Sequence, residues 1–227
     1  MDLRAFAAVL FPPSCVSCRA RIGTGALCAA CRNGIPVFRT LLCGSCRARL
    51  FGDKALCHPD FPYILGAAAS YEHNASRALV HALKFRGRRS AALPLSELLI
   101  EYAESLGTML DGCVVVPIPL STRRLRARGF NQSDLIARPF AERFGLEFAP
   151  LLARIRHTKP QSETRTIEER LTNLCDCFAA PRPAGVAGRS IVLVDDVVTS
   201  GTTFLEAARA LRSAGARKIF ALAVLRA

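Results

Sequence analysis

The stretch that decides the fold is IVLVDDVVTSGTT, residues 191–203. It opens with four apolar residues, continues into the adjacent carboxylates Asp195 and Asp196, and then becomes rich in hydroxyl groups around one glycine. A short apolar run bounded by polar residues is typical of a buried strand. We therefore expect a strand over residues 191–194 that ends at the two acids and is followed by a turn and a helix.

The sequence on either side alternates in the same way between strand and helix patterns. Expected strands cover 64–72, 113–119 and 218–225, and apolar residues at helical spacing predict helices over 75–85, 90–106, 131–145 and 202–215. Asn131 has the character of a helix N-cap and Gly145 that of a helix end. Wholly apolar strands that alternate with helices indicate an α/β fold, a parallel sheet flanked by helices.

The turn after the two acids has the chemistry of a phosphate site. Ligands of parallel sheets bind beyond the carboxyl ends of the strands, where backbone N–H groups at a helix N-terminus suit an anion. Hydroxyl groups add further donors, from Thr199, Ser200, Thr202 and Thr203. Two carboxylates would repel that phosphate, so we expect them to accept hydrogen bonds from a sugar diol. Phosphate and diol together describe a phosphoribosyl group, and the sequence has neither of the glycine-rich nucleotide motifs, GxxxxGK[ST] and GxGxxG, in place.

The N-terminal part of the chain is a cysteine module. Seven of the ten cysteines lie there, as three C-x2-C pairs and one single residue: Cys15, Cys18, Cys28, Cys31, Cys43, Cys46 and Cys57. Two such pairs complete a tetrahedral zinc site, so we expect one or two Zn²⁺ ions. Sequential and crossed wiring of the pairs are both open. The eighth ligand is missing as a cysteine, and His58 or Asp60 would replace it unless the second site is empty.

The remaining cysteines need no such role. Cys113 opens an expected strand and suits a core position, and Cys175 and Cys177 suit two buried thiols better than a redox or metal pair.

Length and composition set the outer limits. The 227 residues, 51% hydrophobic, accommodate a small module over 1–60 and a larger domain over 61–227. No segment is long and apolar enough for a membrane span, and we expect residues before Pro12 and Pro13 to form a short helix and not a signal peptide. The chain is therefore expected to be cytoplasmic, with reduced cysteines. The net charge of +13 favours an anionic partner, phosphate-rich small molecules or nucleic acid.

Residues 191–203 resemble the phosphoribosyl pyrophosphate (PRPP) motif of type I phosphoribosyltransferases. Three further stretches, 78–89, 115–133 and 158–174, together with the motif and the cysteine pairs, make the chain similar to the ComF family of competence-associated proteins. The resemblance implies a type I phosphoribosyltransferase-like sheet, PRPP with Mg²⁺ as ligand, and a role in DNA uptake.

The resemblance also implies roles for individual residues. Asp195 and Asp196 would hold the ribose hydroxyls, and residues 199–203, Gly201 included, would bind the 5′-phosphate. The remaining contacts would be to pyrophosphate or in a closing loop, from Pro117 to Leu120, Ser121, Arg123, Arg124, Lys84, Arg86, Arg156, Thr158, Lys159 and Gln161. Catalysis, if it occurs, would depend on Asp195, Asp196, Arg156 and Lys84, and the acceptor hood would come from the N-terminal side.

Three functions remain open at this point. In the first, a PRPP-binding competence protein contacts single-stranded DNA through the basic segments 84–89 and 123–128, with Phe85 and Phe130 stacking on bases unless they pack in the core. In the second, the chain is a phosphoribosyltransferase of nucleotide salvage. In the third, it senses PRPP without turnover and changes its affinity for partners such as other competence proteins.

Overall fold

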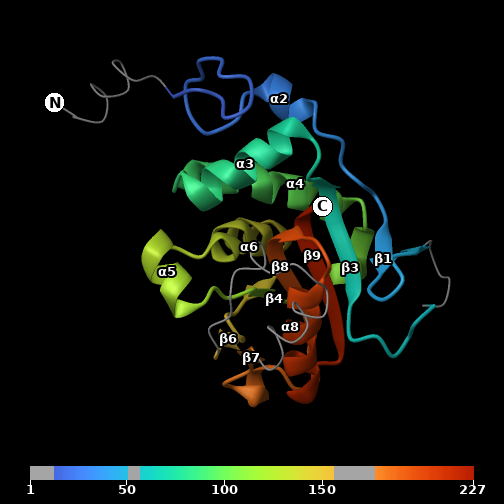
Figure 1. Ribbon diagram of the computed structural model, residues 1–227. Coiled ribbons are helices and arrows are strands. Elements are labelled where there is room, and N and C mark those ends of the chain that lie inside the picture. The colour runs from blue at the N-terminus through green and yellow to red at the C-terminus, as the bar shows by residue number, and fades with distance from the viewer. Residues whose placement is uncertain (1–12, 51–56, 156–176) are drawn as a thin grey trace.

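A seven-stranded sheet organises the protein in the computed structural model, which describes residues 13–50, 57–155 and 177–227 (Figure 1). The strand order is β2-β1-β3-β9-β8-β4-β5. The strands are β1 (Leu41–Cys43), β2 (Arg49–Leu50), β3 (Ile64–Ser70), β4 (Val114–Pro117), β5 (Glu147–Phe148), β8 (Ser190–Val198) and β9 (Lys218–Arg226). The five strands from β3 to β5 pair in parallel, which confirms the predicted α/β fold.

Helices cover both faces of this sheet. The covering helices are α3 (Asn74–Phe85), α4 (Ala92–Glu104), α6 (Gln132–Phe144) and α8 (Thr202–Ser213). Two shorter helices, α2 (Ala29–Asn33) and α5 (Thr122–Arg128), bury no residue and lie outside these layers. Side chains alternate along a strand, so Val192 and Val194 pack with α3, α4 and α6, whereas Ile191 and Leu193 pack with α8. Burial on both faces explains why β8 begins as a continuous apolar run.

The strand at the two acids is longer than expected. We predicted that it would end at residue 194, but β8 continues to Val198. Its pairing with β4 stops at Pro117 and Val194, while its pairing with β9 continues to Val198 and Arg226. The long neighbour β9 therefore keeps Asp195 and Asp196 in extended backbone, beyond the end of β4 on one side only.

The other expected elements occur close to their predicted places. Asn131 caps α6 by accepting from the Ser133 N–H at 3.4 Å, and Gly145 ends that helix with a φ of 62°. Cys113 and Cys177 are buried thiols, as predicted, and Cys177 precedes β7 (Phe178–Ala179) of a small hairpin with β6 (Ala153–Arg154). Two predictions concern residues outside the described ranges: the short helix before Pro12 and Pro13, and the buried thiol of Cys175.

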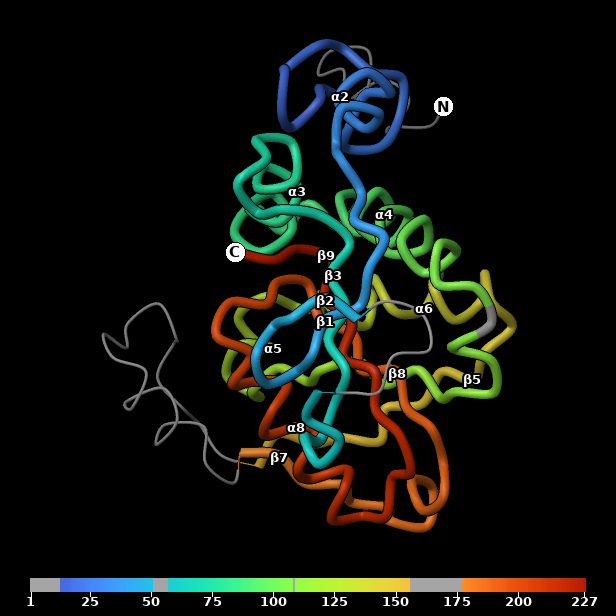
Figure 2. Tube along the Cα trace, turned by 90° about the vertical axis from the view of Figure 1, so that its right-hand side faces the viewer, coloured from blue at the N-terminus to red at the C-terminus, as the bar shows by residue number. Residues whose placement is uncertain are grey.

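The N-terminal segment is joined to the sheet. Strand β1 pairs antiparallel with β3, Leu42 opposite Leu65, and β2 forms the edge. Figure 2 shows β1 and β2 beside β3, while the segment around α2 lies over α3 and α4. A boundary at residues 60 and 61 remains a prediction. Among the helices of the described residues, none combines the length and the apolar character needed to cross a bilayer.

Candidate functional site

The two adjacent acids lie in different environments. Asp196 is 2% exposed and forms an ion pair with Lys84 of α3, with Nζ and Oδ1 2.9 Å apart. Its other oxygen, Oδ2, is buried and accepts no hydrogen bond from the described residues. Asp196 therefore keeps one acceptor position that the surrounding protein does not fill, although buried polar atoms are normally satisfied.

Asp195 is half-buried and is held from two sides. The Ser133 hydroxyl at the start of α6 donates to its Oδ1 at 2.9 Å, and the Asp196 N–H donates to the same atom at 2.9 Å. Burial, and next the negative charge of Asp196, raise the pKa of Asp195 to about 7, against the opposing effect of Lys84. The carboxyl group of Asp195 therefore keeps its proton to a higher pH than an ordinary aspartate does.

The predicted phosphate loop leads directly into α8. Gly201 has a φ of 82° and is the N-cap of this twelve-residue helix. The hydroxyl groups of Ser200 and Thr202 lie 2.8 Å apart, and Thr202 N–H donates to Ser200 Oγ at 3.5 Å. Thr199 and Ser200 are exposed, whereas Gly201 and Thr202 are buried. Exposed hydroxyls over the amides of a helix N-terminus form an arrangement that suits an anion.

The segment after β4 is more ordered than the loop we expected. Asn131 ties it down, because its Nδ2 donates to the Ile118 carbonyl at 3.0 Å. Ser121 is the N-cap of α5 and accepts from the Arg124 N–H at 3.4 Å, while Arg123 is exposed. Pro117 ends β4 beside Val194, one residue before the acids, so this segment does border them.

Two cations near the acids were not singled out from the sequence. Burial lowers the pKa of Arg128, and the charges of Asp196 and Asp195 oppose this effect. Its Nη1 donates to Gln132 Oε1 at 2.5 Å, one residue before the Ser133 that donates to Asp195. Arg154 responds in the same way to burial, and Asp195 is among the charges that oppose it. Arg128 is one of four arginines within residues 123–128, so its position in the sequence does not distinguish it from the others. The expected contacts Arg156, Thr158, Lys159 and Gln161 lie outside the described residues.

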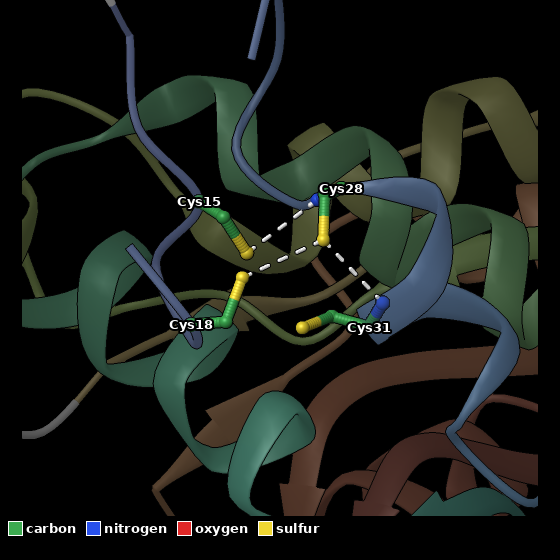
Figure 3. A group of neighbouring side chains, drawn as sticks. All are labelled: Cys15, Cys18, Cys28 and Cys31. Atoms are coloured by element: carbon green, nitrogen blue, oxygen red, sulfur yellow. Dashed lines mark hydrogen bonds between the residues drawn. The ribbon is translucent and has the colours of Figure 1, made fainter. Parts of the chain in front are cut away.

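The first cysteine cluster has the geometry of a zinc site. Sulfurs of Cys15, Cys18, Cys28 and Cys31 lie within 4.8 Å of one another and converge in Figure 3. Tetrahedral Zn–S bonds of about 2.3 Å require sulfurs roughly 3.8 Å apart, and Cys18 and Cys28 are 3.7 Å apart. Burial alone would raise the pKa of Cys15, but N–H groups of Cys28, Cys18 and Ser17 outweigh it and lower the pKa to about 6. A thiolate is the form that binds metal.

In the second cluster a histidine takes the place of the missing fourth cysteine. Cys43, Cys46, Cys57 and His58 have their ligand atoms within 4.8 Å of one another, and Cys43 Sγ is 3.5 Å from His58 Nδ1. The potential ligands thus group in sequential order among the described residues, and His58, not Asp60, lies in the second group. Zinc binding by these residues remains a prediction. Both ligand sets, Cys₄ and Cys₃His, are ones that structural Zn²⁺ adopts.

Comparisons with known proteins agree with both parts of the site. A phosphoribosyl transferase domain model matches residues 132–227, and a double zinc ribbon domain model matches residues 6–59. DNA utilization protein YhgH of Salmonella typhimurium is 32% identical over 217 residues, which span 85% of this chain and 93% of that protein. Competence protein F of Haemophilus influenzae is 26% identical over 90% of this chain and 93% of its own. Competence protein ComFC of Bacillus subtilis is 29% identical over 88% and 78%, respectively.

Proposed function

Because this chain belongs to the ComF family, with DNA utilization protein YhgH and competence protein F among its relatives, we propose that it binds PRPP beside β8 and single-stranded DNA on an adjoining basic surface during DNA uptake. A cytoplasmic location, where thiols stay reduced, suits the two cysteine clusters and is part of the proposal.

The observation that most supports PRPP binding is the unfilled acceptor on Asp196. A ribose hydroxyl would supply the donor that Oδ2 lacks, and ionised Asp195 would accept from the neighbouring hydroxyl. Buried acceptors without donors are costly, so a ligand that satisfies one gains affinity. A sugar diol is the part of PRPP with two adjacent donors.

The two anionic ends of PRPP would bind different groups near the acids: hydrogen-bond donors of the loop at one end and cationic side chains at the other. The loop at residues 199–203 would hold the 5′-phosphate through its amides and hydroxyls. Lys84, which pairs with Asp196, and Arg128, whose pKa responds to the charges of both acids, would attract the pyrophosphate. Mg²⁺ prefers oxygen ligands such as these carboxylates and, when bound with pyrophosphate, neutralises part of its charge.

The surface proposed for DNA is smaller than the basic segments 84–89 and 123–128. Lys84 pairs with Asp196, Arg88 donates to the carbonyls of Ser14 and Gly25, and Arg89 stacks on Phe130, which is 7% exposed. Phe130 is therefore a core residue. These contacts leave exposed Phe85, the last residue of α3, and Arg86 directly after it; Phe85 is 71% exposed, with one ring contact to His81 at 4.9 Å.

The arginines of α5 extend this surface. Arg89 donates to the Gly129 carbonyl at 3.0 Å and so joins the end of α3 to the end of α5, where Arg123 and Arg126 are exposed. An exposed aromatic ring next to exposed cations is the combination that binds single strands without sequence preference. The surface also borders the proposed PRPP site, because each basic segment contributes one residue to that site, Lys84 from 84–89 and Arg128 from 123–128.

A second candidate function is phosphoribosyl transfer, favoured by the cations around Asp195 and Asp196. Pyrophosphate would leave C1 of the ribose with the bonding electrons, and a nitrogen of the acceptor base would form the new bond and lose its proton. Lys84 and Arg128 would stabilise the charge that develops on the leaving group. Pyrophosphate release in the presence of PRPP, Mg²⁺ and a panel of bases tests this candidate.

Two binding measurements test the proposal itself. Calorimetry with Mg²⁺ should give tighter binding of PRPP than of ribose 5-phosphate or pyrophosphate, because only PRPP carries the 5′-phosphate, the diol and the pyrophosphate in one molecule.

The DNA surface is tested by a double variant. Phe85→Ala with Arg86→Ala should weaken binding of an oligothymidine and reduce by about 0.7 the slope of log affinity against log salt concentration. The matched control is Leu93→Ala with Arg182→Ala, which removes one exposed apolar side chain and one exposed arginine elsewhere. Equal DNA affinity in both variants would contradict the assigned surface.

A further inference from the structure

Arg47 connects the second cysteine cluster to the loop proposed to bind phosphate. It follows Cys46 directly in the chain, yet its Nη2 donates to the Ser200 carbonyl at 2.8 Å, across 153 positions of sequence. Tyr63 supports the next residue, because its hydroxyl donates to the Gly201 carbonyl at 3.4 Å. The carbonyls of two consecutive loop residues thus accept hydrogen bonds from side chains on either side of Cys57 and His58 in the sequence, Arg47 and Tyr63.

Holding these carbonyls also orients amide groups. In a trans peptide the C=O of one residue and the N–H of the next point in opposite directions. Fixing the Ser200 carbonyl toward Arg47 therefore turns the Gly201 N–H away from it. The Gly201 carbonyl also accepts from the Leu205 N–H at 2.9 Å, the first hydrogen bond of α8, so the helix and Tyr63 together orient the Thr202 N–H. These are amides that an anion at the start of α8 would use.

The contact is close enough to require glycine in the loop. A Cβ on residue 201 would collide with Arg47 Nη2 and lie 2.8 Å from the Tyr63 hydroxyl, and the φ of 82° disfavours other residues as well. The second terminal nitrogen, Nη1, is buried and has no acceptor among the residues that the structure describes. The guanidinium therefore keeps a donor for an anion next to the loop.

The cysteine knuckle determines where Arg47 points. Its φ of 63° is unusual for a residue with a side chain, and the turn maintains it, because Arg47 N–H donates to the Cys43 carbonyl at 3.0 Å and Cys43 N–H donates to the Ala48 carbonyl at 2.8 Å. A metal ion bound by Cys43 and Cys46 would hold this turn closed. Its loss would free the backbone that positions Arg47.

The first cluster contains a natural control for this arrangement. Arg19 follows Cys18 as Arg47 follows Cys46, also with a φ of 63°, and its N–H donates to the Cys15 carbonyl at 3.0 Å. Its side chain is exposed and makes no hydrogen bond or ion pair with the loop within the described residues. The knuckle geometry is therefore common to both clusters, whereas the contact with the loop belongs to the second.

We propose that Arg47 is a positioning residue of the phosphate loop, and that zinc binding at Cys43, Cys46, Cys57 and His58 and phosphoribosyl binding at residues 199–203 strengthen each other through it. The ligand half of this inference rests on the proposed function. The zinc half depends only on the contact between Arg47 and the loop.

The first test needs no ligand. Hydrogen exchange of the amides of Gly201 and Thr202 is measured in the zinc-loaded full chain, before and after removal of zinc with a chelator. In the wild type, zinc removal should speed exchange about fivefold or more. Arg47→Ala should exchange at the fast rate with zinc still bound, and Arg19→Ala should behave as the wild type. Slow exchange in Arg47→Ala, or equal effects of the two alanine variants, would overturn the inference.

A second variant guards against misfolding of the knuckle. Arg47→Gly removes the same side chain but favours the positive φ, so it should keep zinc and still show fast exchange in the loop. Slow exchange in zinc-loaded Arg47→Gly would also overturn the inference.

The ligand half is tested by titrating PRPP with Mg²⁺ into the same variants. Arg47→Gly should bind about tenfold more weakly or worse, and PRPP should protect one of two zinc ions from the chelator in the wild type but not in this variant, since coupling is reciprocal. PRPP binding that is equal in all variants would refute the coupling and leave the proposed function standing. No PRPP binding by the wild type, with exchange still controlled by Arg47, would instead refute the proposed function and leave the zinc half standing.

Discussion

At the scale of single residues, the two neighbouring aspartates differ in burial and hydrogen bonding. Asp196 is buried against Lys84 and keeps one acceptor unfilled, whereas Asp195 is half-buried, hydrogen-bonded by Ser133 and has a raised pKa. The sequence predicts that both acids belong to the ligand site, because two adjacent carboxylates directly after a buried strand are unusual in a surface turn. It does not predict their difference, which depends on α3 and α6.

We predict that Asp195→Asn stabilises the protein at pH 8 and has little effect near pH 4. The unfolded chain ionises Asp195 above about pH 4, whereas the native carboxyl keeps its proton up to about pH 7. Between these values the unfolded state binds fewer protons, so wild-type stability falls relative to the variant as pH rises and then stays level. Urea unfolding should show a difference of about 1–3 kcal/mol at pH 8. A difference that does not change with pH would contradict the raised pKa.

We also predict that Lys84→Met destabilises the protein by about 2–4 kcal/mol, because it leaves the 2%-exposed carboxylate of Asp196 without its cation. Asp196→Asn in the same chain should restore most of this loss. Denaturant unfolding of the two single variants and the double variant measures the coupling. Additive losses would show that the two charges do not depend on each other.

At the scale of elements, the long apolar and amphipathic segments were predictable and the short ones were not. β3, β4, β9, α3, α4, α6 and α8 follow periodicity that their own residues display. Helix α5 was not predicted, because four of its seven residues are arginine and show no apolar periodicity, and because we assigned the segment around its N-cap Ser121 to a loop. Strands β1, β2 and β5 have two or three residues, too few for a pattern, and form only because neighbouring strands pair with them.

The cap of α6 offers a test at this scale. Asn131→Ala should destabilise the protein by about 1–2 kcal/mol, because it removes both the cap to Ser133 and the donor to the Ile118 carbonyl. Asn131→Asp keeps the capping acceptor but loses the donor, and so should cost less stability while still weakening PRPP binding next to Pro117. Thermal unfolding and calorimetry separate the two effects. Equal stability losses in the two variants would assign the whole effect to the Nδ2 donor, which contacts both the Ile118 carbonyl and Asp134 Oδ1.

At the scale of the whole molecule, the two cysteine clusters are attached to the α/β domain by arginines. Arg88 and the ion pair of Arg32 with Glu101 hold the first, and β1 together with Arg47 holds the second. The sequence predicts the seven cysteines of the two clusters and leaves the eighth ligand open, and it predicts none of these contacts, because one arginine among many has no local signature. The chain thus appears modular in sequence and is joined in space.

Metal content follows from this architecture. Purified protein should contain two zinc ions per chain, Cys15→Ser and His58→Ala should each lower the number toward one, and only the loss of the second ion should loosen residues 199–203. Elemental analysis combined with hydrogen exchange measures both quantities. Two zinc ions retained in His58→Ala would remove His58 from the ligand set.

The central claim is that a phosphoribosyl ligand binds at Asp195, Asp196 and the loop that follows them. The most direct measurement is a calorimetric titration of PRPP with Mg²⁺ into the wild type and into Asp195→Asn combined with Asp196→Asn, after circular dichroism has shown that the double variant is folded. We predict micromolar binding by the wild type and a loss of at least about a hundredfold in the variant, as two charge-assisted hydrogen bonds are weakened. Unchanged affinity in the folded double variant would contradict the account.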